Sequence, residues 1–205
     1  MRIYVYVLKH DSGFAPNPFH GWCTLACCKP AIRRKARPGD WVVGITPRDL
    51  DNRLAYAMKV DESLTFEEYG LDRRFKAKRP RWKTRGVKHR GDNCYEPLGN
   101  GKFRQLPSNH YDHKNGRENQ RLKKTDLGGK RVLVGRRFCY YGDEAVPFPK
   151  RVNFKRPERY NRVNFTDKEK SQLLEFLESL PQGIQGQPRS WPTDDKSWSK
   201  GTKCG

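Results

Sequence analysis

The apolar residues of this 205-residue chain are gathered in a few short segments, and this distribution constrains the fold most strongly. Residues 2–8 alternate Ile and Val with Tyr and Leu, so both faces of an extended segment are apolar, as in a buried strand. Residues 40–46 and 53–60 are also strand-like, and the Asp-, Asn- and Pro-rich turn between them predicts a β-hairpin. Residues 130–142 predict a further strand. Several separated strands with few helices indicate an α+β fold around a small mixed or barrel-like sheet.

Three helices are predicted between or after these strands. Pro30 suits the first position of a short helix over residues 30–36, and residues 65–70 form another short one. The clearest is a C-terminal amphipathic helix over residues 166–181, where Thr166 and Glu169 have the spacing of a capping box. Its leucines lie on one face, which we expect to pack on the sheet.

The length and composition favour one domain with a small, aromatic-rich core. Hydrophobic residues make up only 34% of the chain, whereas aromatic residues reach 12%. We expect a single domain over residues 1–181, with a basic, largely irregular insertion over about 72–128, and a flexible tail over 182–205. No segment has the length of a signal peptide or a membrane span, which favours a cytoplasmic location, no membrane partner and reduced cysteine thiols.

The positive charge is concentrated in the middle of the chain. The net charge is +20, and residues 70–162 carry 27 Lys and Arg against 9 Asp and Glu. Such a distribution favours nucleic acid, or a nucleotide, as the partner; the alternative is a solvated surface that is basic only for solubility. The phosphate-binding candidates in this part of the chain are Arg79, Arg81, Lys83, Arg85, Arg136 and Arg137.

Residues 13–28 carry no charge and are rich in Pro, Gly and aromatic residues. A loop stiffened by two prolines could present Phe14, Phe19 and Trp22 as a wall on which a base stacks. Asn17 and His20 could hydrogen-bond to the base edge. Lys29 and Arg33, one turn apart on the following helix, would then bind a phosphate. The alternative is a hydrophobic plug over one end of the sheet, with both cations simply solvated.

Other candidate base-binding residues stand in short polar contexts elsewhere. Loops held by a rigid scaffold concentrate such residues, and amide side chains suit the reading of base edges. These further candidates are Asp40, Trp41, Asp92, Asn93, Gln105 and His110. For Asp40 the alternative is that its carboxylate only closes a turn.

No recognisable catalytic motif is present. The chain lacks a Walker loop, a dinucleotide-binding glycine motif and the zinc-deaminase signature. If the protein is an enzyme, Cys23, His110 and Asp92 have the residue types of a nucleophile, a base and an orienting group. Residues 20–28 hold one His and three Cys but lack the paired spacing of zinc ribbons, so we expect neither metal nor cofactor.

The motifs GFAPNPF, CTLACCKPAIR, GDWVVG, YAMKV, RF-KA-KRP, GDN-Y, QLPS-H and F-YYG resemble, in order, the nucleotide-modification-associated domain 2 family of bacteria and phages, and the first and sixth are distinctive. The resemblance spans roughly residues 1–150 and implies a role linked to modified DNA bases. A weaker similarity, in element order, is to PUA-like folds that bind modified bases. The positions that the family resemblance highlights are Phe14, Asn17, Phe19, Cys23, Thr24, Lys29, Arg33, Asp40, Trp41, Asp92, Asn93, Gln105 and His110.

Three functions remain open from the sequence. The leading hypothesis is a module that binds nucleic acid, with DNA implied by the resemblance, or a nucleotide, and recognises a modified or flipped base. The second is an enzyme that acts on such a base or nucleotide. The third is an adaptor that docks a DNA-modification enzyme.

Overall fold

The computed structural model describes residues 1–152, 157 and 164–191, and it has the mixed α+β content predicted from the sequence. The described strands form one five-stranded sheet, one three-stranded sheet and a separate hairpin, and they do not close into a barrel. The strands are β1 (Ile3–Val7), β2 (Cys23–Leu25), β3 (Trp41–Ile45), β4 (Leu54–Lys59), β5 (Glu62–Leu64), β6 (Tyr95–Gly99), β7 (Lys102–Gln105), β8 (Val132–Gly135), β9 (Phe138–Tyr140) and β10 (Gly183–Ile184). The α-helices are α1 (Pro30–Lys35), α2 (Phe66–Leu71), α3 (Gln120–Leu127) and α4 (Asp167–Glu178), and the 3₁₀ turns are η1 (Arg48–Leu50), η2 (Arg73–Lys78), η3 (Gly86–Arg90) and η4 (Gly142–Glu144).

The five-stranded sheet has the order β1-β3-β4-β9-β10 and is mixed. The β1–β3 and β9–β10 pairs are parallel, whereas β3–β4 and β4–β9 are antiparallel, so the predicted hairpin is confirmed. Helix α4 covers one face, where Leu173 and Leu177 pack with Val43 of β3. The predicted capping box is also confirmed, because Thr166 and Glu169 exchange side-chain and backbone hydrogen bonds.

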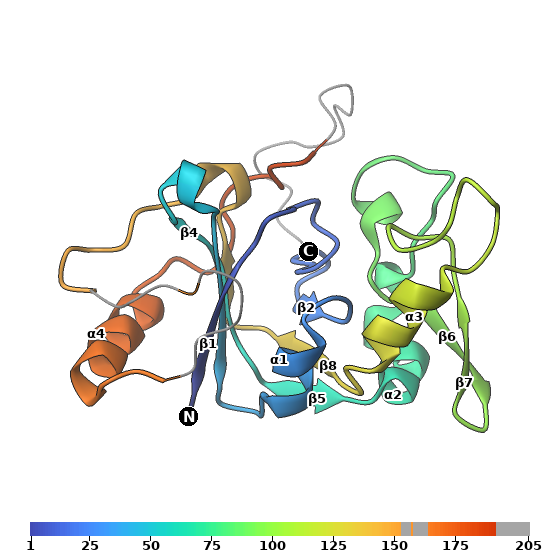
Figure 1. Cartoon of the computed structure of the whole chain (residues 1–205), viewed down its shortest axis with the longest axis horizontal. Helices are drawn as coiled ribbons and strands as arrows, with labels where there is room; N and C mark the ends of the chain where they lie inside the picture. Colours follow the sequence, from blue (N-terminus) through green and yellow to red (C-terminus); the bar gives the residue numbers. More distant parts are fainter. Residues whose placement is uncertain (153–156, 158–163, 192–205) are drawn as a thin grey trace.

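The opposite face of this sheet is also covered, so both faces of β1 are buried as its sequence predicts. Ile3 and Val5 belong to the core under α4, while Tyr4 and Tyr6 pack with α1 and β2. The antiparallel three-stranded sheet β2-β8-β5 lies beside this second core. Figure 1 shows α4 at one end of the long axis and α2, α3, β6 and β7 at the other.

The single strand predicted over residues 130–142 is two strands in two different sheets. β8 belongs to the three-stranded sheet and β9 to the five-stranded one. The backbone at Gly135, the last residue of β8, passes close to the backbone of β4. A Cβ at position 135 would lie 2.3 Å from the Lys59 carbonyl oxygen, so only glycine fits this crossing.

The basic insertion is more regular than we expected. Between residues 91 and 128 the chain forms the β6–β7 hairpin and helix α3, and α1 packs against α3. The sequence signals are weak because β6 contains Pro97 and Gly99, and α3 carries five polar or charged residues in its first six positions.

The first ten residues of the expected tail pack on the domain. Strand β10 pairs with β9, and Trp191 is buried with its ring edge-on to Phe19. The rest of that expected tail, residues 192–205, lies outside the described residues. No helix in the described ranges is long and apolar enough to span a membrane.

Candidate active site

The turn from β2 to α1 carries Cys28 in an unusual backbone conformation. Cys28 and Lys29 have φ angles of 59° and 40°, in the left-handed region, which costs a non-glycine residue roughly 1–2 kcal/mol. Pro30, with its fixed φ, then begins α1. Strained backbone concentrates at functional sites, and a nucleophile on a strained strand-to-helix turn is the arrangement of the hydrolase nucleophile elbow.

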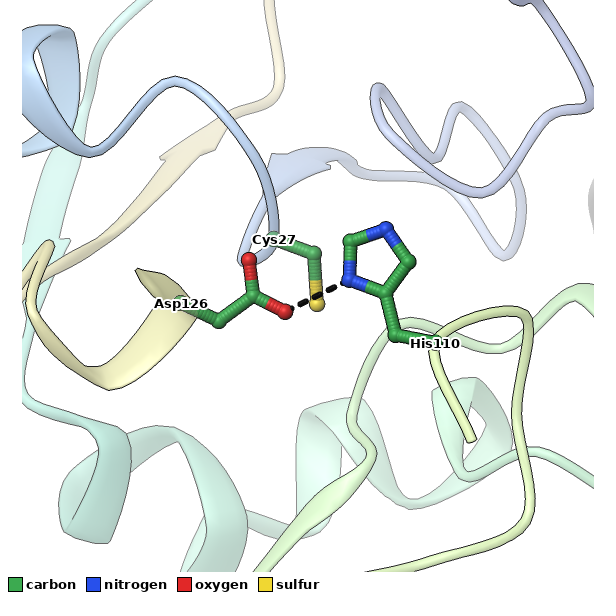
Figure 2. Close-up of side chains that lie close together, drawn as sticks. All are labelled: Cys27, His110 and Asp126. Carbon is green, nitrogen blue, oxygen red and sulfur yellow. Dashed lines mark hydrogen bonds and ion pairs between the residues drawn. The ribbon is translucent and has the colours of Figure 1, made fainter. Parts of the chain in front are cut away.

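Cys28, His110 and Asp126 form a continuous chain of contacts from three separate segments. The Sγ of Cys28 lies 3.6 Å from Nε2 of His110, whose Nδ1 lies 2.6 Å from Oδ2 of Asp126. Figure 2 shows the His110 ring pointing toward the Asp126 carboxylate, with the Cys27 sulfur close to both. The order thiol, imidazole, carboxylate is that of a nucleophile, a general base and an orienting group. Cys28 is half-buried and the His110 side chain is 16% exposed, so reagents can reach the site from solvent.

Asp126 is fixed at the C-terminal end of α3 by several donors. Tyr95 Oη donates to Oδ2 at 2.7 Å, and the backbone N–H of Cys28 donates to Oδ1 at 2.8 Å. Burial alone would raise the pKa of Asp126, but the hydrogen bonds from His110 and Tyr95 outweigh it and keep the pKa below its ordinary value. The group is therefore an ionised acceptor, and the Nδ1 of His110 carries the proton between them.

His110 is held in place on both its ring and its backbone. Burial would lower its pKa, but the contacts with Asp126 and Cys28 raise it to about 10. Phe14 packs edge-on against the ring at a centroid distance of 4.9 Å. Gln105, predicted as a base reader, donates to the His110 carbonyl oxygen at 3.1 Å and so positions this loop.

The sequence suggested that Lys29 and Arg33 bind a phosphate together at the surface, but Arg33 does not lie at the surface. Its side chain is completely buried and donates to the carbonyl oxygens of Cys28, Asp126 and Arg131 at 2.6–2.8 Å. Its guanidinium lies 4.0 Å from Asp126 Oδ1. Arg33 therefore holds the Cys28 turn, α3 and the start of β8 together.

Lys29 follows Cys28 directly in the same turn. Its Nζ sits 4.4 Å from the centre of the Tyr6 ring and donates to the Val7 carbonyl oxygen at 3.4 Å. Burial lowers the pKa of this lysine. Lys29 remains a half-buried cation next to Cys28, whereas the predicted Lys29–Arg33 pair is not formed.

The predicted trio of Cys23, His110 and Asp92 is also not assembled. Asp92 is buried and accepts hydrogen bonds from Thr24 Oγ1 and Tyr69 Oη, both at 2.7 Å. Cys23 lies within β2 in the core, and burial raises the pKa of its thiol. The structure instead brings His110 to Cys28 and Asp126.

The uncharged stretch is mostly buried, which agrees with the plug alternative. Phe14 and Phe19 are each at most 3% exposed. Asn17 donates to the carbonyl oxygens of Gly13 and Arg90 and accepts from the buried ammonium of Lys78 at 2.6 Å. These contacts occupy the amide that the sequence suggested for a base edge.

Two of the candidate residues in this stretch, His20 and Trp22, are half-buried. Nε2 of His20 is buried without a hydrogen-bond partner among the described residues, and burial lowers the pKa of this histidine. The Trp22 ring has two guanidinium groups near it, those of Arg74 and Arg136, each 5.2 Å from its centre.

The other predicted base-binding residues have structural contacts. Asp40 accepts from the backbone N–H groups of Arg2 and Arg37, as the turn-closing alternative requires. Trp41 lies in the core under α4. Asn93 donates to the carbonyl oxygens of Tyr69 and Phe75.

Part of the basic run is structural and part is exposed. Buried Lys78 donates to the carbonyl oxygens of Asn17 and Trp22, and Arg79 pairs with Glu96. Arg81, Lys83 and Arg85 are exposed. We call residues 79–90 the basic arm. It is anchored by Trp82, whose ring stacks on that of His113 with a centroid distance of 3.6 Å. The centroids of the Trp82 and His89 rings are 4.0 Å apart.

The last two phosphate candidates differ in their surroundings. Arg136 is exposed beside Trp22, whereas Arg137 pairs with Glu178 of α4 and donates to its carbonyl oxygen. In the part of the chain that the structure describes, neither arginine contacts the Cys28 turn.

Sequence reasoning missed Asp126 and did not select Cys28. Asp126 is the one acid in the basic segment from 119 to 142, a signal that it has a specific partner. Cys28 follows Cys27 directly, and residue order alone did not show which thiol faces His110.

The comparisons with known proteins give a family. The chain belongs to the family described as nucleotide modification associated domain 2, whose model matches residues 1–195. Neither a curated protein nor a solved structure matches the chain.

Proposed function

We propose that this member of the nucleotide modification associated domain 2 family is an enzyme that acts on a nucleobase or nucleotide through a thiol nucleophile. The observation that carries the proposal is the Cys28–His110–Asp126 contact chain on a left-handed strand-to-helix turn. Cys28 is the nucleophile, His110 the base and Asp126 the group that orients the imidazole.

The reaction that this arrangement supports is addition of sulfur to an electrophilic carbon of the base or of a group attached to it. His110 holds the proton of the Cys28 thiol on Nε2 as an imidazolium, in line with its raised pKa, and the thiolate sulfur forms a bond to the carbon, whose displaced electron pair moves to an attached heteroatom. The imidazolium proton goes to that heteroatom, which departs with its group. Water then attacks the carbon and gives a proton to Nε2 of His110, and the carbon–sulfur bond breaks to restore the thiolate, so the net reaction is hydrolysis. No redox partner is required for this sequence.

Three features of the site support a nucleophile rather than a structural cysteine. Cys28 is half-buried, while Cys27 and Cys23 are fully buried. Its backbone is held by Arg33 at the carbonyl and by Asp126 at the N–H. The cation of Lys29 lies next to it, where it could stabilise negative charge on a substrate.

A first experiment measures the reactivity of Cys28. Alkylation by iodoacetamide, in the presence of a chelator and followed by peptide mass spectrometry, should modify Cys28 at least tenfold faster than Cys23. His110→Ala should slow this alkylation at least tenfold, because no base then accepts the thiol proton. Equal rates in wild type and His110→Ala would overturn the nucleophile assignment.

A second measurement looks for the chemistry itself. DNA with modified and unmodified bases, and free nucleotides, are incubated with wild-type protein and with Cys28→Ser, then digested for mass analysis of the bases. We expect a mass change that Cys28→Ser abolishes. Identical base masses after both incubations, with all substrates, would contradict an enzymatic role.

The binding-module hypothesis stays the second candidate, and the exposed surface favours it. The basic arm presents Arg81, Lys83 and Arg85, and the half-buried Trp22 has two guanidinium groups 5.2 Å from its ring centre. These groups suit phosphates and stacked bases. In an enzyme the same surface would hold the polymer whose base enters the site.

A further inference from the structure

Cys27 lies next to the proposed catalytic residues without belonging to the contact chain. Its sulfur, a ring nitrogen of His110 and a carboxylate oxygen of Asp126 all lie within 4.8 Å of one another, and Nδ1 is the nitrogen in contact with Asp126. Figure 2 shows these three side chains converging on one point from three separate segments. A fourth donor, a second sulfur, is near, because Sγ of Cys94 lies 3.7 Å from Sγ of Cys27.

We infer that these residues form a binding site for a thiophilic divalent metal such as Zn²⁺, with Cys27, His110 and Asp126 as ligands and Cys94 as the fourth. Zinc in proteins takes four N, S or O donors at about 2.0–2.3 Å. In a tetrahedral site the donors are then about 3.3–3.8 Å apart. The Cys27 and Cys94 sulfurs already lie at 3.7 Å, whereas Nδ1 of His110 and Oδ2 of Asp126, now 2.6 Å apart, would separate on metal binding. Two thiolates and one carboxylate would exceed the metal charge by one, and the buried guanidinium of Arg33 lies 4.0 Å from Asp126 to offset it.

Metal binding would exclude the catalytic state of His110. The metal would occupy Nδ1 in place of its hydrogen bond to Asp126, and the Nδ1 proton would leave to solvent. The contact that orients the imidazole toward Cys28 would then be lost. The thiol protons of Cys27 and Cys94 would go to solvent. This effect on His110 rests on the proposed function, whereas the metal site itself rests only on geometry.

Cobalt(II) is the probe for the site, because thiolate ligation to Co²⁺ gives a ligand-to-metal charge-transfer band in the near ultraviolet. Titration of the reduced, metal-free full chain should give one saturable site with this band. Cys27→Ser should weaken Co²⁺ binding at least tenfold and reduce the band, while the neighbouring Cys28→Ser should retain both. Circular dichroism and thermal melting of each variant show whether it folds, and Cys94→Ser provides a second ligand variant if Cys27→Ser does not.

Two results would overturn the site: no saturable Co²⁺ band, or a band that survives Cys27→Ser and Cys94→Ser but disappears with Cys28→Ser. A separate assay measures iodoacetamide labelling of Cys28 with and without stoichiometric Zn²⁺, which should slow labelling at least tenfold. Fast labelling of Cys28 without a saturable Co²⁺ site would support the proposed function and reject the metal site. A saturable Co²⁺ site with slow labelling of metal-free Cys28 would support the metal site and reject the proposed function.

Discussion

The two ends of the molecule bury their side chains by different means. Under α4, the core against β1, β3 and β9 is formed by apolar side chains, including Val43 and Leu177. At the other end, around α2, α3 and the β6–β7 hairpin (Figure 1), the interior contains the charged groups of Arg33, Lys78 and Asp126. A buried charge is tolerated only with specific partners, whereas an apolar core needs mainly volume and pattern. The polar end is therefore the less replaceable, and it is the end that holds the candidate active site.

The largest effect is expected at the polar end. Arg33→Ala removes three hydrogen bonds to buried carbonyl oxygens and leaves the Asp126 charge without its guanidinium. We expect a loss of about 3–5 kcal/mol in the free energy of unfolding, measured by urea denaturation. The neighbouring Arg34→Ala is the matched control, because Arg34 is exposed, and should change stability by less than about 0.5 kcal/mol. A loss below about 1 kcal/mol for Arg33→Ala would contradict the comparison.

A smaller loss is expected at the apolar end. Leu177→Ala leaves a cavity under α4 and should cost about 2–4 kcal/mol, whereas Leu177→Met, which keeps the volume, should cost less than about 1.5 kcal/mol. Neither variant should alter the alkylation rate of Cys28 in the folded protein. Slower alkylation in Leu177→Met would show that the two ends are coupled, and would argue against treating them as separate.

The smallest effect on stability is expected from the basic arm, where function should change instead. Replacement of Arg81, Lys83 and Arg85 by Ala should leave the unfolding free energy within about 0.5 kcal/mol of the wild-type value. If the arm binds nucleic acid, the log–log slope of affinity against salt should become shallower by about 0.7–0.9 for each phosphate that the variant no longer neutralises. A control that removes the same charge elsewhere, Arg48, Lys168 and Lys170 to Ala, should keep the slope. Equal slopes in the two triple variants would exclude the arm as the phosphate surface.

The same difference between the two ends explains what could be predicted from sequence. Helix α4 was predictable because its leucine spacing and its capping box are local patterns, and both describe one apolar face on a sheet. The hairpin β3–β4 was predictable for the same reason. At the polar end, α3 lacks an apolar stripe, and β6 contains Pro97, which is atypical of a strand, so no local pattern predicted either element.

The site could be anticipated by residue type but not by position. A thiol, an imidazole and a carboxylate were expected, and the structure places His110 beside a thiol and a carboxylate. These partners were not the expected ones, because Cys28 and Asp126 are 98 residues apart and meet only when the fold brings the β2–α1 turn against α3, where Arg33 bonds to both. Buried charge misled the interpretation as well, since Arg33 and Lys78 have the sequence context of surface cations but are completely buried.

The contacts between residues 8–19 and residues 189–191 have a consequence for how the protein is made. Ser190 donates to the Asp11 carbonyl oxygen at 2.7 Å, Arg189 donates to that of Leu8, and Trp191 packs on Phe19. At synthesis rates of about 5–20 residues per second, the ribosome adds residue 191 roughly 10–40 s after β1. During that time Phe19 has no Trp191 to cover it, and the carbonyl oxygens of Leu8 and Asp11 lack their contacts with Arg189 and Ser190. The loop that follows β1 therefore completes its native contacts only after residues 189–191 have been synthesised.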